Sequence, residues 1–190
     1  MANLPIAYSE GFNPHQKMSF AMPLSLGMAS VGEYIDIELK KEMDTQGIID
    51  SLNEAFPEGL KILKARQLGT KEKTGAAITA AAMYKISLTD DTITQKNIDT
   101  MLQTPQIHIL KKTKKKEQMI DIRPMIYSAG MGDNNTINLI LAAGSELYLK
   151  PEMVVEYLYE GRNFGRPFYL REELLKADST GGGFESLFDR

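Results

Sequence analysis

The chain has 190 residues, 43% of them hydrophobic and 25% charged, a balance typical of a soluble globular protein with one ordinary domain or two small ones. It contains no cysteine, so disulfides, a cysteine nucleophile and cysteine-ligated iron–sulfur clusters are excluded within these residues. With two histidines and a net charge of −3, it lacks the residues for a histidine-rich metal site and needs a local patch for any nucleic-acid contact. We therefore expect no metal and no cofactor.

The N-terminal residues predict strands and turns rather than a targeting signal. They lack the basic start and long apolar run of a signal peptide, so we expect a cytoplasmic protein with no membrane partner. Short strands are predicted at 5–8, 17–24 and 33–39, the last because apolar and polar side chains alternate along it. Residues 11–14 (GFNP) carry turn signals, since glycine permits positive φ and asparagine before proline favours a turn.

The next segment predicts a helix followed by a strand and a linker. Asp44 is a suitable N-cap for a helix that runs to about Phe56, with apolar residues at helical spacing. A strand is predicted at 60–68, and the polar residues 69–75 form a linker or exposed turn. Residues 76–82 are rich in alanine, and both a short helix and the start of the next strand are open for them.

The remainder alternates between strand and helix patterns. The expected order is strand 83–88, helix from 92 or 94 to 105, strand 107–110, hairpin turn 111–116, strand 118–123, strand 136–142, helix 151–161 and strand 166–175. The tail, 177–190, is expected to be flexible, although Phe184, Leu187 and Phe188 could dock.

The order of these elements predicts the fold class. Residues 83–175 read strand, helix, strand, strand, strand, helix, strand, and residues 5–68 read the same way without the leading strand and helix. We therefore predict an α+β protein of two ferredoxin-like (split βαβ) units with largely antiparallel sheets. The expected units are 1–70, which is incomplete at its N-terminus, and 76–176, followed by the tail 177–190.

One long segment carries a family resemblance. The family pattern joins a Tyr-Ser-x-Gly-Phe-Asn-Pro-His-x-Lys turn to Ser-Phe-Ala-x-Pro-Leu and then Gly-Glu-Tyr-x-Asp-Ile-Glu-Leu. The matching residues here are Tyr8, Ser9, Gly11, Phe12, Asn13, Pro14, His15, Lys17, Ser19, Phe20, Ala21, Pro23, Leu24, Gly27, Gly32, Glu33, Tyr34, Asp36, Ile37, Glu38 and Leu39. The chain thus resembles a bacterial family of unknown function described as radical SAM-linked or radical SAM-associated.

The resemblance implies a partner and a difference at the N-terminus. Members of that family are similar to companions of a cobalamin-binding radical SAM enzyme, encoded beside it or fused to it. Family members also begin with a strand and a helix upstream of the Tyr-Ser-x-Gly turn, which are missing here, so a late start or a truncation is expected. A link to RNA follows only by analogy, because the ferredoxin-like layout is common among RNA binders.

The first candidate site combines the turn with a neighbouring strand. Asn13, His15 and Lys17 could clamp an anionic ligand, or Asn-Pro-His could shape the loop while Lys17 is solvated. Asp36, grouped with Glu33 and Glu38, could bind a cation or act as an acid/base pair. A solvated strand face is the alternative for these carboxylates.

The second candidate site lies in the lysine-rich hairpin. Its members are Lys111, Lys112, Lys114, Lys115 and Lys116. They could contact a phosphate backbone in a salt-sensitive way, or keep an exposed turn soluble, since no aromatic residues are interleaved to stack on bases. Arg123 could bind a phosphate or carboxylate, or pair with Asp121 or with a neighbouring strand.

These features favour an accessory role. Because the chain has no cysteine to hold a radical SAM cluster, we expect it to be a partner of such an enzyme rather than the enzyme itself, and to bind or present an RNA-type substrate. One alternative is a stand-alone enzyme that acts on a phosphorylated or nucleotide substrate through His15, Lys17 and Asp36. Another is a structural assembly protein.

Overall fold

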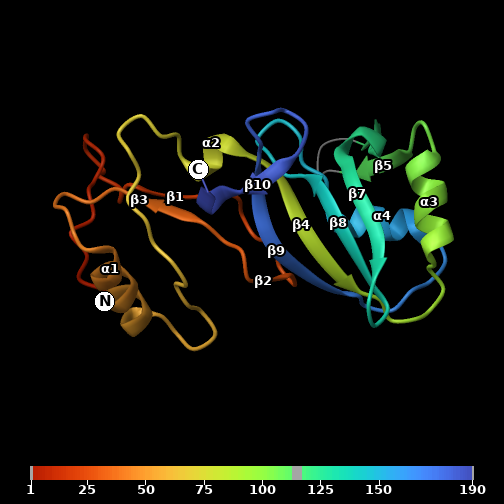
Figure 1. The fold of residues 1–190 in the computed structure, drawn as a ribbon, viewed down its shortest axis with the longest axis horizontal. Coiled ribbons are helices and arrows are strands. Elements are labelled where there is room, and N and C mark those ends of the chain that lie inside the picture. Colours follow the sequence, from red (N-terminus) through yellow and green to blue (C-terminus); the bar gives the residue numbers. More distant parts are fainter. Residues whose placement is uncertain (1, 113–116, 190) are drawn as a thin grey trace. The chain divides into compact units, whose positions relative to one another are not determined.

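The computed structural model describes residues 2–112 and 117–189 and divides into two compact units (Figure 1). Unit 1 comprises residues 1–19 and 35–74, and unit 2 comprises residues 20–34 and 75–190. The predicted α+β class with mostly antiparallel sheets is confirmed. Over the described ranges, no helix has both the length and the hydrophobicity needed to cross a membrane.

The main sheet of unit 2 has the order β10-β9-β4-β8-β7, and all of these neighbours are antiparallel. A short strand, β2, pairs in parallel with β9. The bounds are β2 Ala29–Ser30, β4 Thr79–Ser87, β7 Ile126–Gly132, β8 Thr136–Ala142, β9 Phe168–Ala177 and β10 Phe184–Ser186. The predicted strand at 136–142 is therefore confirmed at both ends.

Two helices pack with this sheet around one core. They are α3 (Gln95–Gln103) and α4 (Pro151–Leu158), and the predicted proline at the first position of α4 is confirmed. Their buried side chains join those of β4, β8 and β9 in a single apolar cluster. The order β4, α3, β7, β8, α4, β9 is strand, helix, strand, strand, helix, strand, although the ferredoxin-like assignment itself stays a prediction.

The main sheet curls at one end. Tyr127 of β7 and Phe184 of β10 belong to opposite edge strands, yet their ring centroids lie 4.8 Å apart. The central strands β4 and β8 carry small residues at this end, where Ala81 is paired with Ala142. Small side chains there leave room for the two edges to approach.

A separate hairpin is inserted between α3 and β7. Its strands are β5 (His108–Lys112) and β6 (Glu117–Asp121), which form a two-stranded sheet of their own. A short 3-10 turn, η1 (Arg123–Met125), connects it to β7. The turn predicted from the lysine run includes residues 113–116, which lie outside the described residues.

Unit 1 has little regular structure. It contains α1 (Thr45–Ala55), most of the two-stranded sheet of β1 (Met18–Phe20) and β3 (Ile35–Ile37), and isolated bridges that join Ile6 to Leu39 and Tyr8 to Gln16. Asp44 caps α1 as predicted, since Gly47 N–H donates to its carboxylate over 3.2 Å.

The strand predicted at 60–68 is wrong, because this segment has no regular structure. Asn53 of α1 holds it instead, with its side chain donating to Ile62 O and accepting from Ile62 N–H. These side-chain bonds take the backbone groups of Ile62 that a strand ladder would use. In the alanine-rich segment both open alternatives occur in turn, with helix α2 (Gly75–Ile78) leading directly into β4.

Two segments differ from the expected division of the chain. Residues 20–34, expected in the first unit, group with unit 2 through the pairing of β2 with β9. The expected tail contains β10, which pairs with β9, and a last 3-10 turn, η2 (Leu187–Asp189). Leu187 is fully buried, so the apolar residues of this segment contribute to the core.

Candidate functional site

The turn singled out in the sequence forms a closed loop at residues 9–17 in unit 1. Ser9 N–H donates to His15 O over 2.8 Å, and His15 N–H donates to Ser9 Oγ over 2.9 Å. Gln16 Nε2 donates to Tyr8 Oη just outside this closure. Gly11 has φ 112°, a conformation that strains other residues, so a glycine is required at this corner.

The 9–17 loop presents side chains to solvent. Phe12 is fully exposed, at 106% of its reference area, and Asn13 and His15 are also exposed. Within residues 2–112 and 117–189, neither the Asn13 amide nor the His15 ring has a hydrogen-bond partner. The loop therefore offers an aromatic face, an imidazole and an amide on a backbone that is already closed.

Positive side chains flank the loop, but they are engaged. Lys17 Nζ lies 3.0 Å from Glu38 Oε1, and both side chains are about half exposed. Lys40 Nζ lies 5.3 Å from the centre of the Tyr8 ring, within cation–π distance. Asp36 is half-buried on β3. The structure thus places Asn13, His15 and Lys17 in one loop. The Lys17–Glu38 ion pair joins this loop to the residue that follows β3, the strand that carries Asp36.

Arg123 belongs to unit 2 and is held by backbone carbonyls. Its Nε and Nη2 donate to Leu102 O over 3.0 and 2.8 Å, and its Nη1 donates to Ile126 O over 3.0 Å. The guanidinium thereby satisfies a carbonyl in the last turn of α3. The expected alternative of pairing with Asp121 occurs only through the backbone, because Arg123 N–H donates to that carboxylate.

Two backbone bonds make Asp121 a strong acceptor. The N–H groups of Ile107 and Arg123 donate to its Oδ1 over 2.8 and 3.0 Å. The hydrogen bond from Ile107 N–H is the largest cause that lowers the pKa of Asp121 below its ordinary value. Asp121 therefore acts as a clamp at the base of the β5–β6 hairpin.

The lysine cluster is described in part. Lys111 is exposed on β5, and the backbone of Lys112 completes this strand. Lys114, Lys115 and Lys116 lie outside the described residues. Whether the cluster contacts nucleic acid stays a prediction.

A buried ion pair in unit 2 was not found from the sequence. The side chain of Arg171 on β9 is 1% exposed, and its guanidinium forms two hydrogen bonds with the Glu33 carboxylate, over 2.7 and 2.6 Å. It also donates to the carbonyls of Met22 and Pro23. Burial alone would lower the pKa of Arg171, but its bonds to Glu33 and the charge of Glu33 raise it. Arg171 therefore anchors the 20–34 segment to β9.

This anchor changes the interpretation of Glu33. The sequence grouped it with Asp36 and Glu38 as a possible cation site, but the Glu33 carboxylate is occupied by Arg171. The available signal was the alternation along β9, which puts Arg171 on the same face as Tyr169, pointing inward. A charge on an inward face requires a partner, but the sequence does not identify which acid supplies it.

Gly32 explains why the anchored segment approaches so closely. A Cβ at this position would lie 2.2 Å from the backbone oxygen of Glu172 on β9. Any other residue would push the segment away from the strand and lengthen the Arg171–Glu33 bonds. The glycine of the Gly-Glu-Tyr motif is thus explained by packing.

The fold and these sites define a mixed α+β protein that has an exposed loop on one unit and a buried anchor on the other. Residues 1–151 match the model of a family described as "Uncharacterized protein conserved in bacteria (DUF2344)". The chain belongs to this family of bacterial proteins. Searches of curated proteins and of solved structures gave no match.

Proposed function

We propose that this protein is a cytoplasmic, non-catalytic accessory partner of a radical SAM enzyme, and that it binds or presents an RNA-type substrate. The observation that carries the RNA part is the closed 9–17 loop with its fully exposed Phe12. The radical SAM part rests on the motif resemblance described above and on the absence of cysteine from the 190 residues. The cluster that such chemistry needs would then belong to the partner.

The chemistry of the 9–17 loop fits an unstacked nucleobase. Bases of single-stranded RNA stack on aromatic and imidazole rings, and their edges accept and donate hydrogen bonds. Phe12 and His15 supply rings, and Asn13 supplies an amide with both a donor and an acceptor. Because the loop is closed by hydrogen bonds before binding, little backbone entropy would be lost.

The rival of a stand-alone enzyme has less support. A general base needs a group that orients it, and within the described residues the His15 ring has no such partner. Lys17 is paired with Glu38 rather than placed against the imidazole. These contacts favour binding over catalysis at this loop.

Fluorescence anisotropy with a labelled single-stranded oligouridine, titrated with the full chain at low salt, tests the RNA part. Phe12→Ala should weaken binding by about 5- to 150-fold, since stacking contributes about 1–3 kcal/mol per base. Phe12→Tyr should bind as the wild type does. Leu26→Ala is the matched control, because Leu26 is equally exposed, at 103%, but lies in unit 2. No binding at low salt would remove the RNA part.

The partner part needs a separate test. The tagged protein should be recovered from its native cells, and the proteins that accompany it identified by mass spectrometry. A radical SAM enzyme recovered in fixed proportion, and reconstituted with the purified chain, would support the accessory role. A chain recovered alone with a bound small molecule would instead favour the stand-alone enzyme.

A further inference from the structure

The main sheet of unit 2 has one covered face and one open face. Tyr84 and Ile86 of β4 are fully buried in the core that includes α3 and α4. Lys85 and Ser87 alternate with them, so they point to the opposite face, where both are half-buried. Directly paired residues lie on the same face, so the register extends it across the sheet. We call this surface the open sheet face, and its residues are Met83, Lys85, Ser87, Asn138, Phe168 and Leu170.

The curl of the sheet closes this face at one end. Ala81 and Ala142 continue the same face of β4 and β8, and both are fully buried at the end where the rings of Tyr127 and Phe184 meet. Two rows of paired residues further along the strands, Lys85 is paired with Asn138, and the Asn138 side chain is exposed. The open sheet face is therefore a concave surface, closed at the alanine end and accessible around Lys85.

The polar groups at the accessible end are unpartnered. Among the described residues, neither the Lys85 ammonium group nor the Asn138 amide has a hydrogen-bond or ion-pair partner, although Lys85 is on the middle strand of the order β10-β9-β4-β8-β7. Glu173 shares this face as the partner of Met83, but its carboxylate accepts hydrogen bonds from Leu174 N–H and Ser186 Oγ, over 2.9 and 3.4 Å. A half-buried lysine without a counter-charge favours an anionic ligand.

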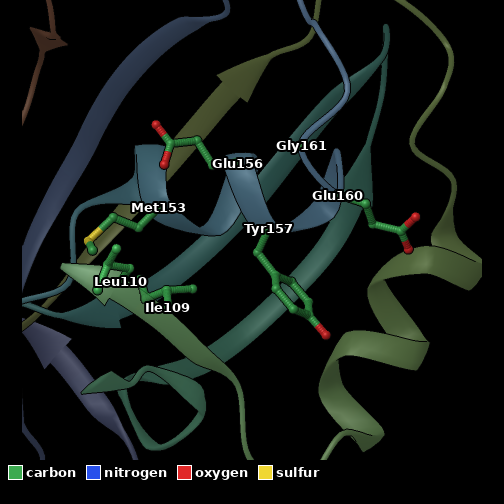
Figure 2. Close-up of a pocket in the computed structure, with 7 residues that line it drawn as sticks. All are labelled: Ile109, Leu110, Met153, Glu156, Tyr157, Glu160 and Gly161. Atoms are coloured by element: carbon green, nitrogen blue, oxygen red, sulfur yellow. The ribbon is translucent and has the colours of Figure 1, made fainter. Parts of the chain in front are cut away.

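The groove beside α4 has the opposite charge. Figure 2 shows Met153 and Tyr157 of α4 on the side of Ile109 of β5, where they line this groove. Its charged lining residues are Glu156 and Glu160, which would repel a phosphate. Of these two surfaces of unit 2, the open sheet face is therefore the one that suits an anion.

We propose that the open sheet face of unit 2 binds single-stranded RNA, with a phosphate at Lys85, a base edge at the Asn138 amide and a base stacked on Phe168. The Phe168 ring is 55% exposed and is paired with Ser87, one row along the strands from Lys85. An aromatic ring, a free amide and a basic side chain are the groups by which proteins contact unpaired bases and their backbone. This inference rests on the proposed function, and it assigns a second RNA-binding surface in addition to the 9–17 loop.

Fluorescence anisotropy with labelled oligouridine and the full chain, repeated from about 50 to 200 mM salt, tests this proposal. Lys85→Gln should weaken binding and reduce the slope of log Kd against log salt concentration by about 0.7, the contribution of one phosphate contact on a single strand. Phe168→Ala should weaken binding at least about fivefold without changing this slope, because stacking involves no phosphate. Lys85→Arg keeps the charge and should retain the wild-type slope.

A matched control separates this contact from a general effect of charge. Lys96→Gln removes the same charge from an exposed position on α3, and should leave both affinity and slope unchanged. Circular dichroism checks that every variant is folded. An equal loss of slope in Lys96→Gln and Lys85→Gln would overturn the proposal.

The same titrations separate this inference from the proposed function. If Phe12→Ala weakens binding while Lys85→Gln and Phe168→Ala bind as the wild type does, the open sheet face is wrong and the RNA part of the proposed function stands. No binding by the wild type at low salt would remove both. A protein that is recovered with the wild type but lost from Lys85→Gln, with oligouridine binding unchanged, would assign this face to a protein and overturn the proposal.

Discussion

Helices α1 and α4 have similar amphipathic patterns but reach different degrees of burial. In α4, Val154, Val155 and Leu158 are buried in the core of unit 2. In α1, the apolar stripe that includes Ile48 and Leu52 is only half-buried, and the helix contains no buried residue. An apolar stripe thus predicts a helix and its inner face, but the degree of burial depends on the surface that the fold provides.

The two units as wholes also differ in how many apolar side chains they bury. Among the described residues, Ala7 is the one buried apolar residue of unit 1, whereas unit 2 has a continuous core that involves β4, β8, β9, α3 and α4. Unit 1 is held instead by side-chain bonds such as those of Asn53 and by the Lys17–Glu38 pair. Substitutions in unit 2 should therefore cost far more free energy of unfolding than comparable ones in unit 1.

The largest difference is expected between the two ion pairs. Glu33→Ala would leave the buried Arg171 guanidinium without its carboxylate, and should lower the free energy of unfolding by about 3–5 kcal/mol, near the lower end because Glu33 is 31% exposed. Glu38→Ala removes the exposed partner of Lys17 and should cost no more than about 1 kcal/mol. Urea unfolding followed by circular dichroism measures both, since the chain has no tryptophan.

A compensating variant makes this test specific. Replacing both members of the buried pair, as Arg171→Met with Glu33→Leu, removes the uncompensated charge and should recover part of the lost stability. If Glu33→Ala lowered the free energy of unfolding no more than Glu38→Ala does, the Arg171–Glu33 pair would not be the stronger of the two, which would contradict the prediction.

The next largest difference in stability between the two units is expected when an apolar side chain is shortened in each. Leu139 of β8 is 1% exposed, so Leu139→Ala should cost about 2–5 kcal/mol through lost burial and the cavity left behind. Leu63 of unit 1 is 67% exposed, so Leu63→Ala should change stability by less than about 0.5 kcal/mol. Denaturant midpoints of the two variants give the comparison, and equal losses would contradict it.

Sequence patterns predicted β4, β8, β9, α3 and α4 of unit 2 because these strands and helices obey simple periods, but they missed β7, for which no strand was expected. Alternation located β8, and the Asp44 and Pro151 signals located the starts of α1 and α4. The same rules failed at residues 60–68, where Asn53 binds the backbone of Ile62 from nine residues away. No local period carries that information.

The sites divide in the same way. The sequence could predict a turn at residues 11–14, because glycine, proline and asparagine have local conformational effects. It could not predict that Arg171 binds Glu33, because these residues lie 138 positions apart and only the fold brings them together. The carboxylates near residue 36 therefore looked equivalent, although Glu33 is bound by a buried arginine and Glu38 by an exposed lysine.

A smaller effect is expected for the side chain that organises unit 1. Asn53→Ala removes both bonds to Ile62 and should lower the stability of unit 1 by about 1–2 kcal/mol, since each hydrogen bond contributes about 1 kcal/mol. Hydrogen exchange should speed up at residues 45–68 and stay unchanged in β4 and β8. Gln46→Ala, which removes one exposed bond to Asp50 on the same helix, is the control. Faster exchange in β8 would mean that the units unfold together.

The smallest expected effect concerns the clamp of the β5–β6 hairpin in acid. The pKa of Asp121 is lowered in the folded state from its ordinary value of 3.8, chiefly by the bond from Ile107 N–H. A lowered folded pKa gives stability that is fully present above 3.8 and is lost as the pH falls through the folded value. Asp121→Asn should therefore melt below the wild type at pH 7, and the two melting temperatures should converge as the pH falls.

The control for this pH dependence is an exposed carboxylate elsewhere in unit 2. Glu146→Gln removes the same charge, but over the described residues Glu146 accepts no hydrogen bond, so its melting curve should follow the wild type at every pH. The difference in melting temperature between Asp121→Asn and the wild type could instead stay constant down to strong acid. The two N–H bonds would then depend on the shape of the Asp121 side chain and not on its charge. Convergence would assign a share of the acid sensitivity of unit 2 to one clamp at the base of the β5–β6 hairpin.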